Sequence, residues 1–447
     1  MRILQLLLAF TIWLLLAGCG NLSDPQSSTG SVSSGSDTPS ARQASGTRMI
    51  VVLKSGRADE VASAHGLVPS RRYSKALNGF AAPGNAEKMA RLRQDPRVAY
   101  VEIDPPVYLV GKPAGGGGKT PPPPPPPQVT PTGVDRVDAD MSATARINGV
   151  DERVPVGVAV IDTGIDLDHP DLVVRHGYNF VRDGKPAEDD EGHGSHVAGT
   201  IGARDNGVGV VGVAPGATVW AVKVLDAQGR GWGSDVIAGV DWVARNAAAN
   251  DIRVANMSLG MPATQAVDDA VRNAIVNSGV TFVLAAGNSG ADAVAYSPAR
   301  VAEAITVSAI ADTDGKPGRL GADFSFTLSL GGSYVVPDDC FARVESVAGG
   351  SYSYTNYGPG VDIAAPGSAI YSTYKAAGYQ TLTGTSMAAP HVAGAAALLL
   401  AQNPALTPAE VAARLTDPVA GTFDYGYKSP GNDPDGIQEP LLNVRGF

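Results

Sequence analysis

The fold is constrained most by four short apolar runs, which read VGVAVID, VWAVKVLD, RVANMSLG and TFVLAAGN. Apolar and polar residues hardly alternate within them, as is typical of strands in a parallel sheet that is covered on both faces. Helix-forming segments such as SDVIAGVDWVARNAA and TQAVDDAVRNAIVNSG separate the runs. This order predicts an α/β fold with a doubly wound, mostly parallel sheet. Ligands are then expected at the carboxyl ends of its strands.

The composition excludes one broad class of partner. The 447 residues carry a net charge of −10, and the lysines and arginines are scattered rather than gathered in a stripe. Nucleic acid is therefore not expected as the main partner. With 44% hydrophobic residues, the chain can fill the cores of two or three domains.

The first 18 residues predict a secretory signal peptide. Arg2 precedes an apolar run at 3–17, and this run is shorter than the roughly 20 residues that span a membrane. The LAGC motif that ends at Cys19 resembles the lipobox of bacterial lipoproteins, which implies cleavage before Cys19 and a lipid on its sulfur. An ordinary signal peptide with a chance cysteine is the alternative. Residues 19–47 are rich in Ser, Gly and Thr and predict a flexible tether.

The only other cysteine in the sequence is Cys340. No intramolecular disulfide is expected once Cys19 carries a lipid. We expect Cys340 to be a buried apolar filler, with a reactive thiol as the alternative.

The remaining chain divides at a segment of glycines and prolines. Residues 48–110 contain strand-like runs and the helix NAEKMARLRQDP, and they predict a small α+β unit of ferredoxin-like β-α-β-β-α-β order. Residues 111–127 hold four consecutive glycines and seven consecutive prolines, which predict a linker that is open to proteases. The α/β pattern occupies residues 128–447.

Polar residues stand where the buried strands are expected to end. Asp162 closes VGVAVID, Ser258 follows RVANM, and Asn288 closes TFVLAAG. A further serine, Ser386, follows Gly384 at the start of an apolar helix, where backbone N–H groups and the helix dipole favour a developing oxyanion. A serine nucleophile needs a base within hydrogen-bond reach.

Two histidines in EGHGSHVAGT are candidates for that base. Their spacing of three, with Gly194 and Ser195 between them, differs from the H-E-x-x-H pattern of zinc helices, so metal binding is the less favoured alternative. His193 lies between two glycines that let other backbone approach, and we expect it to be the base. His196 is expected to be a packed, hydrogen-bonded structural histidine. Asp162, at the end of a buried strand, is the expected carboxylate that orients the base.

Three motifs make the chain resemble the subtilisin-like serine proteases, or subtilases. They are Asp-Thr-Gly at 162–164, His-Gly-Ser-His at 193–196 and Gly-Thr-Ser-Met-Ala-Ala-Pro at 384–390, and the order Asp, His, Ser is that of subtilisin. The resemblance implies a three-layer subtilisin-like fold and a serine endopeptidase that hydrolyses extended polypeptides through an acyl-enzyme. It also implies that the enzyme is made as an autoprocessed preproprotein. A non-catalytic peptide-binding protein on the same scaffold is the alternative.

The resemblance also implies individual roles. Asp162, His193 and Ser386 would be orienting carboxylate, general base and nucleophile, and the side chain of Asn288 would join the Ser386 N–H in an oxyanion hole. Two segments would pair with an extended peptide as neighbouring strands. Their residues are Ser258, Leu259 and Gly260 in one segment, and Gly229 and Gly231 in the other.

Residues 48–110 resemble the inhibitory propeptide of this family, which acts as an intramolecular chaperone. A small binding domain of unrelated purpose is the alternative. The lipid site lies upstream of this unit, so cleavage between about Val110 and Gln128 would free the catalytic domain from its anchor. We therefore expect an exported bacterial protein that contacts the membrane only through its N-terminal lipid before maturation. Its mature domain would lie at the cell surface or outside the cell.

No cofactor is expected for catalysis, but RDNGVGVVGVAP at 204–215 resembles the structural calcium loop of the family. All the implied ligands are oxygens, as this hard cation requires. They are the side chains of Asp171, Asn206 and Gln128 and the carbonyl groups of Arg204, Val208 and Val210. A plain glycine-rich turn is the alternative.

Two further features concern the cleft and its surroundings. Small apolar residues at 258–260 and 285–287, with Tyr296 as a wall, indicate an open apolar pocket. Residues 311–353 form an insertion relative to compact members of the family. Within it FSFTLSLGGSYVV predicts a hairpin that turns at Gly331-Gly332, and the sequence leaves the role of this insertion open.

Overall fold

The computed structural model describes residues 47–109, 125–317, 320–327, 333–336, 338–346, 351–416, 423–424 and 434–447. The chain divides into residues 1–44 and 45–447, and every described residue belongs to the second unit. The expected signal peptide, Cys19, nearly all of the tether and most of the expected linker lie outside the described residues. Within the described ranges, no helix has the length and apolar character needed to cross a bilayer.

Residues 47–103 form a small α+β unit of β-α-β-β-α-β order, which confirms the predicted ferredoxin-like arrangement. Its antiparallel sheet has the strand order β2-β3-β1-β4 and a core of its own that includes Met49, Phe80 and Leu92. Asn85 caps the second helix by accepting a hydrogen bond from the Lys88 N–H at 2.9 Å. The elements are β1 (Thr47–Leu53), α1 (Ala58–Ala64), β2 (Arg71–Tyr73), β3 (Gly79–Gly84), α2 (Ala86–Gln94) and β4 (Val98–Ile103).

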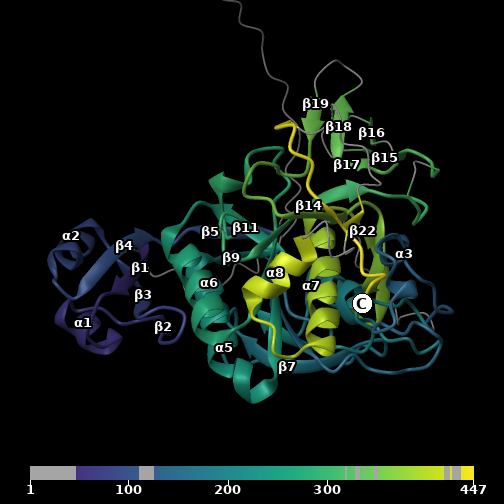
Figure 1. The fold of residues 1–447 in the computed structure, drawn as a ribbon. Helices are drawn as coiled ribbons and strands as arrows, with labels where there is room; N and C mark the ends of the chain where they lie inside the picture. The colour runs from purple at the N-terminus through teal and green to yellow at the C-terminus, as the bar shows by residue number, and fades with distance from the viewer. Residues whose placement is uncertain are drawn as a thin grey trace, which may run out of the picture. The chain divides into compact units, whose positions relative to one another are not determined.

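A large sheet of order β23-β24-β20-β14-β12-β10-β6-β8-β7 forms the centre of the rest of the chain (Figure 1). From β24 to β7 every neighbouring pair is parallel, as the uninterrupted apolar runs predicted, and β23 and β17 add antiparallel strands. The strands are β6 (Gly157–Asp162), β7 (Val173–Asn179), β8 (Thr218–Lys223), β10 (Ile252–Met257), β12 (Thr281–Ala285), β14 (Ile305–Ala311), β17 (Cys340–Phe341), β20 (Ile363–Pro366), β23 (Phe423–Asp424) and β24 (Leu441–Leu442).

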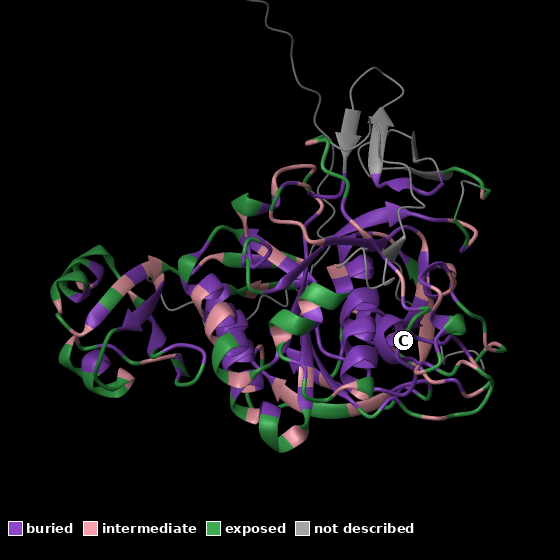
Figure 2. Ribbon diagram, in the orientation of Figure 1, coloured by how far each residue is buried: buried purple, intermediate pink, exposed green. Residues whose placement is uncertain are grey.

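Helices cover both faces of this sheet, so that three layers result. Strand β6 shows why its sequence does not alternate: Val158 and Val160 pack into the core on the side of α4, α7 and α8, whereas Ala159 and Ile161 pack into the core on the side of α5 and α6. Figure 2 shows α7 buried along most of its length. The helices are α3 (Thr132–Arg136), α4 (His193–Gly202), α5 (Gly233–Asn250), α6 (Gln265–Ser278), α7 (Thr385–Gln402) and α8 (Pro408–Thr416), with 3₁₀ turns η1 (Ala139–Met141) and η2 (Ala293–Ala295).

Two smaller sheets surround the edge where the central strands end. One has the order β13-β11-β5-β9, and the other is the hairpin of β21 and β22. Strand β5 comes directly after the small N-terminal unit, so this sheet joins segments that are far apart in the sequence. The strands are β5 (Pro106–Leu109), β9 (Arg230–Trp232), β11 (Leu259–Pro262), β13 (Tyr296–Ser297), β21 (Ile370–Tyr374) and β22 (Gly378–Leu382).

The insertion at 311–353 forms an antiparallel sheet of order β15-β16-β18-β19. Strands β15 (Phe324–Thr327) and β16 (Ser333–Val336) pair with each other, which confirms the predicted hairpin, while its turn lies outside the described residues. The other strands are β18 (Arg343–Ser346) and β19 (Ser351–Ser353). Cys340 lies in β17 and is 2% exposed, which agrees with the expected burial.

Candidate active site

Asp162 and Ser258 lie at the same edge of the central sheet. Strands β6 and β10 are parallel neighbours with Val160 opposite Asn256, so the carboxyl end of β6 at Asp162 lies beside the end of β10, which Ser258 follows. Strand β12 pairs with β10 on its other side and leads to Asn288. The register of three parallel strands thus gathers the polar residues that the sequence indicated.

His193 is the first residue of α4 and contacts Asp162 directly. Its Nδ1 lies 2.9 Å from Asp162 Oδ1 and 3.0 Å from Oδ2, and the two residues are 2% and 0% exposed. A Cβ on Gly192, whose φ is 117°, would overlap the ring of Tyr374, and one on Gly194 would overlap the Gly164 carbonyl. Gly194 therefore lets the helix start close to the end of β6, and Gly192 lets the same turn pack against the Tyr374 ring.

The charge around His193 favours the protonated imidazole. Burial alone would lower its pKa, but the charge of Asp162 and their hydrogen bond raise the pKa of His193 above its ordinary value, with smaller contributions from Glu191 and Asp189. On the far side of the ring, Nε2 is buried and accepts or donates no hydrogen bond within the described part of the chain. This nitrogen is the one that a base would use.

Ser386 is the second residue of α7, which packs against α4. It is 1% exposed, and its Oγ donates a hydrogen bond to the Ser258 carbonyl at 3.2 Å. In return, Ser258 Oγ donates to the Ser386 carbonyl at 3.0 Å. These bonds place Ser386 at the end of β10, one strand spacing of about 4.8 Å from the strand that ends in Asp162.

Asn288 lies against the N-terminus of the same helix. Its Oδ1 accepts hydrogen bonds from the Thr385 N–H at 2.9 Å and from Thr385 Oγ1 at 3.0 Å, which turns its NH₂ group away from Thr385. Asn356 fixes the loop that carries it, because Asn356 Oδ1 accepts from the N–H of Ser289 at 2.9 Å and its Nδ2 donates to the Ala286 carbonyl at 2.8 Å. The amide at 288 is thus held in one orientation by groups on both sides.

The two segments expected to bind an extended peptide already hold one. Strand β5 lies between β9 and β11 and is antiparallel to both, with Leu109 opposite Leu259 and Tyr108 opposite Gly260. On the other side Val107 pairs with Gly231, and the Leu109 N–H donates to the Gly229 carbonyl at 2.9 Å. The chain's own residues 106–109 therefore occupy the position of a peptide strand.

Comparison with known proteins agrees with this geometry. Residues 155–429 match the family model described as "Subtilase family". The chain belongs to the subtilase family. Residues 32–110 match the model described as "Peptidase inhibitor I9".

Among relatives of this subtilase, an "Extracellular serine proteinase" of Thermus sp. (strain Rt41A) is 40% identical over 350 residues, which cover 77% of this chain and 71% of that protein. "Subtilisin BL" of Lederbergia lenta is 42% identical over 277 residues, covering 62% and 86%. A crystal structure of a cold adapted subtilisin-like serine proteinase shares 35% identity with a TM-score of 0.52 and covers 70% of this chain and 97% of that one. These matches confirm the predicted fold, the serine endopeptidase activity and the preceding inhibitor domain.

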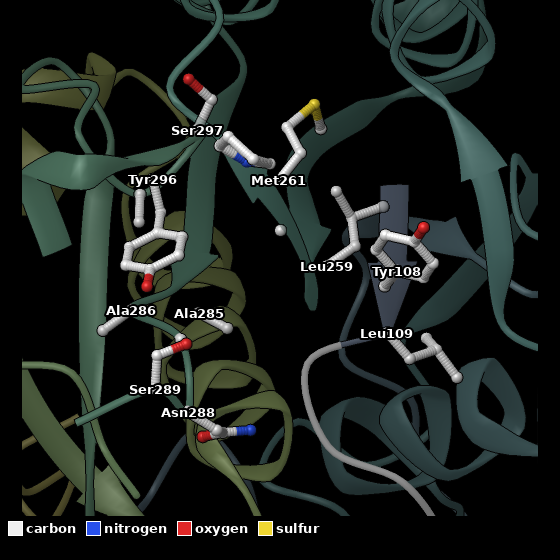
Figure 3. Close-up of a pocket in the computed structure, with 14 residues that line it drawn as sticks. Tyr108, Leu109, Leu259, Met261, Ala285, Ala286, Asn288, Ser289, Tyr296 and Ser297 are labelled. Carbon is white, nitrogen blue, oxygen red and sulfur yellow. The ribbon is translucent and has the colours of Figure 1, made fainter. Parts of the chain in front are cut away.

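A pocket of about 280 Å³ opens beside Asn288 in this subtilase (Figure 3). No charged side chain belongs to its described lining, and small apolar residues predominate, with the ring of Tyr296 on one side. The lining consists of Tyr108, Leu109, Leu259, Gly260, Met261, Pro262, Ala285, Ala286, Gly287, Asn288, Ser289, Tyr296, Ser297 and Ala299.

The residues implied as calcium ligands come together from three segments. Asn206 Nδ2 lies 3.1 Å from Asp171 Oδ1, and the Arg204 N–H donates to the Asp171 carbonyl at 3.0 Å. Gln128 Oε1 accepts hydrogen bonds from the backbone N–H groups of Asn206 and Gly207 at 2.9 and 2.8 Å. Val208 and Val210 pair with the segment that carries Gln128. All six expected residues thus border one small region.

The donor set fits a hard cation. Asp171 is fully buried, and its side-chain oxygens contact the neutral Val210 N–H, the Asn206 amide and the Tyr379 hydroxyl. A buried carboxylate without a cationic contact is costly, and a bound cation with surrounding carbonyl oxygens would offset that cost.

The second histidine of EGHGSHVAGT has the structural role predicted for it. His196 is fully buried, and its Nε2 lies 2.9 Å from the Ile370 carbonyl and 3.0 Å from the Gln380 carbonyl. Burial lowers the pKa of His196 to about 3, so it is neutral at physiological pH. Across the described ranges, the three side chains close enough to share a metal are Asp312, Asp314 and Asp338, and neither histidine is among them.

Two residues that support the site were not found from the sequence. Asn356 holds the loop of Asn288, and Asp189 accepts hydrogen bonds around His193. Neither lies in a motif with a chemical meaning of its own, and their partners are backbone groups and, for Asp189, also two hydroxyl groups. The sequence carries no pairing signal for such contacts.

Proposed function

We propose that Asp162, His193 and Ser386 are the catalytic triad of this subtilase, with Asn288 and the Ser386 N–H as its oxyanion hole. The observation that carries the proposal is the buried contact between His193 Nδ1 and both oxygens of Asp162. That contact fixes the tautomer with the proton on Nδ1 and leaves Nε2 as the proton acceptor. The position of Ser386 at the helix N-terminus beside β10 supports its role as nucleophile.

In the proposed reaction Ser386 Oγ attacks the scissile carbonyl while His193 Nε2 takes its proton. Asp162 stabilises the imidazolium that forms, and the tetrahedral oxyanion accepts hydrogen bonds from the Ser386 N–H and from Asn288 Nδ2. His193 then gives the proton to the leaving amine, and an acyl-enzyme remains. Water attacks the acyl group with His193 again as base, which releases the acid and restores Ser386.

The substrate is proposed to bind as an added strand between β9 and β11, with Ser258, Leu259 and Gly260 on one side and Gly229 and Gly231 on the other. The place of residues 106–109 between these strands supports the assignment. The apolar pocket beside Asn288 then accepts an apolar side chain next to the scissile bond. Cleavage of peptides that differ only at that residue tests this: equal rates for leucine and glutamate would refute it.

Substitution of the nucleophile tests the reaction. Ser386→Ala is expected to abolish casein cleavage and labelling by a serine-directed phosphonate, while the melting temperature stays near that of the parent chain. The matched control is Asn277→Ala, at an exposed position in α6 of the catalytic unit, which is expected to keep both activities. Casein cleavage at the parent rate by purified Ser386→Ala would rule out the proposed nucleophile.

We further propose that this chain binds structural calcium through Asp171, Asn206, Gln128 and the carbonyl groups of Arg204, Val208 and Val210. The ion would hold the Gln128 segment to the loop at 204–210. In the inactive Ser386→Ala chain, a calcium chelator is expected to lower the melting temperature, and Asp171→Asn is expected to remove this effect. Asp168→Asn, at a nearby exposed position, is the control. A melting temperature that does not respond to the chelator would favour a plain glycine-rich turn.

The N-terminal segments support a proposal about export and processing. We propose that residues 1–18 are a signal peptide, that Cys19 carries a lipid, that 19–47 is a tether, and that 48–110 is the inhibitory propeptide. Cleavage within 111–127 would then release the catalytic unit, 128–447, from the membrane. The Thermus relative is an extracellular serine proteinase by name, which supports export of this chain. N-terminal sequencing of the mature enzyme together with membrane fractionation tests this, and mature enzyme still joined to the lipid would refute release.

A further inference from the structure

Asp189 is a buried carboxylate near His193 with no part in the proposed reaction. It is 4% exposed, and both of its oxygens accept several hydrogen bonds. Oδ1 accepts from Thr163 Oγ1 at 2.9 Å and from the Gly192 N–H at 2.7 Å. Oδ2 accepts from the Ser195 N–H at 2.9 Å and from Ser195 Oγ at 2.6 Å. So many donors on one buried side chain indicate a fixed position.

These donors come from the two segments that carry the proposed base and its carboxylate. Thr163 directly follows Asp162, whereas Gly192 and Ser195 flank His193 on either side. Thr163 Oγ1 closes the connection, because it also accepts a hydrogen bond from the Gly194 N–H at 2.9 Å. Asp189 therefore joins the end of β6 to the start of α4 through contacts on both.

The start of α4 depends on this carboxylate for a second reason. The residue at the N-cap position is Gly192, which has no side chain to accept the exposed N–H groups of the first turn. Asp189 takes that role from outside the helix by accepting from Gly192 and Ser195. Gly192 lets the helix begin close to Tyr374 but offers no capping side chain. The carboxylate of Asp189, earlier in the same loop, supplies the missing hydrogen-bond acceptor.

A buried lysine forms a third link between the segment after β6 and the loop before α4, and it carries a positive charge. Lys223 is 2% exposed, and its Nζ donates to the Thr163 carbonyl and, at 2.6 Å, to Asp190 Oδ1. It lies opposite Asp162 in the pairing of β6 with β8. The same two segments are therefore linked by an ammonium group as well as by Asp189.

We propose that Asp189 is a positioning residue, which acts through Thr163 and the N-terminus of α4 to hold His193 against Asp162. This inference rests on the proposed roles of Asp162 and His193. An asparagine at 189 cannot replace the carboxylate. Whichever way its amide turns, the NH₂ group faces backbone N–H donors, those of Gly192 on one side or Ser195 on the other.

Asp189→Asn in the full chain tests the proposal, after maturation by a second protease at a site inserted into 111–124. The concentration of active enzyme is measured by titration with a serine-directed phosphonate. Unfolded chains are therefore excluded from the concentration used to calculate kcat. We expect kcat to fall about 10²-fold, the loss that a small misplacement of a catalytic group can cause, with KM within about twofold. The pKa seen in the pH profile of kcat/KM is expected to fall, because one of the negative charges facing His193 is gone. The carboxylates that face it are Asp162, Glu191 and Asp189.

Glu188→Gln is the matched control. It removes a carboxylate from the adjacent, exposed position, whose side chain accepts only from the Leu167 N–H at 3.4 Å among the described residues, and it is expected to leave kcat and the profile unchanged. Thr163→Val and Thr163→Ser form a second pair of variants. The valine removes the hydroxyl that links the end of β6 to the start of α4, and the serine keeps it. The valine variant is expected to lose activity as Asp189→Asn does, and the serine variant to retain it.

Parent values of kcat and of the pH profile in Asp189→Asn, or in Thr163→Val, would overturn the inference. So would a loss that appears only in the number of titrated sites, since that would assign Asp189 to folding alone. Failure of the proposed triad is distinguishable, because it would appear as casein cleavage by Ser386→Ala whatever the result at residue 189.

Discussion

The contact between the propeptide unit and the catalytic unit contains a buried arginine, and its removal gives a quantitative prediction. Arg71 in β2 is 7% exposed, and its Nε donates to Asp235 Oδ1 at 2.7 Å. Its other nitrogens donate to Asp183 at 3.2 Å and to the Phe180 carbonyl. Asp235 lies in the first turn of α5 and is 6% exposed. Arg71→Met therefore leaves a buried carboxylate without its guanidinium partner.

The magnitude follows from where the two partners lie. Removing one member of a buried pair costs about 3–5 kcal/mol because the other charge stays buried. Here that cost arises only in the complex, because the Asp235 carboxylate becomes hydrated when the propeptide unit dissociates. Burial raises the pKa of Asp235, so protonation relieves part of the cost, and we take the lower value of about 3 kcal/mol. Asp183, whose side chain is 41% exposed, adds little. The complex should weaken about 10²-fold.

Dissociation of the two units measures this effect. In the Ser386→Ala background, a second protease cuts a site inserted between residues 111 and 124, and release of the propeptide is followed on dilution. Arg72→Met is the control, because Arg72 is exposed and pairs at 2.7 Å with Asp59 of its own unit. The double variant Arg71→Met, Asp235→Leu should recover most of the affinity, as apolar replacement of a buried pair often does. Equal affinity of the parent and Arg71→Met complexes would refute the reasoning.

Three further predictions concern the site and its histidines. Asn288→Ala should lower kcat about 10²–10³-fold with little change in KM, a range measured on subtilisin itself, and a kcat near the parent value would exclude Asn288 from the oxyanion hole. Because the pKa of His193 is raised and only neutral imidazole accepts a proton, kcat/KM should fall with decreasing pH through a pKa above that of an ordinary histidine. Burial lowers the pKa of His196 to about 3 and of His391 to about 4, so the stability they contribute is present above about pH 6.5 and lost as pH falls below it. Melting temperatures between pH 7 and 4.5 test this, and His391→Gln should reduce the slope.

The sequence predicted the features that depend on local pattern and on side chains with chemistry of their own. The lack of alternation in VGVAVID predicted a strand buried on both faces, and the cores on either side of β6 confirm it. The alternation around Gly331-Gly332 predicted the hairpin of β15 and β16. The glycines beside His193 indicated close approach of other backbone, which the Gly164 carbonyl confirms at Gly194, whereas the neighbour of Gly192 is the Tyr374 ring.

The residues that hold the catalytic side chains in position could not be predicted from local sequence pattern. Asn356 holds backbone N–H and carbonyl groups, and Asp189 holds backbone N–H groups and the hydroxyls of two residues. Such partners occur throughout the chain, so no distinctive side chain identifies either residue. Asn356 follows the inserted sheet and reaches the loop of Asn288 only through the tertiary fold. From the sequence, Asp189 could equally have been a solvated carboxylate in a loop. Its burial in the structure is what identifies it as a support of the site.

In the proposed binding mode, the substrate uses the strands β9 and β11 that hold the chain's own residues 106–109, and this limits how latency or substrate recognition can change. Gly231 pairs with Val107 of β5, and a Cβ at 231 would overlap the Val224 carbonyl behind the strand. Gly229, with φ of 68°, accepts the Leu109 N–H, and a Cβ there would overlap the Leu109 side chain. A substitution that disturbs these glycines to alter substrate binding therefore also disturbs the fit of the chain's own segment. Contacts away from the cleft, such as Arg71 with Asp235, are free of this constraint, so the duration of inhibition can be tuned there without altering which peptides are cut.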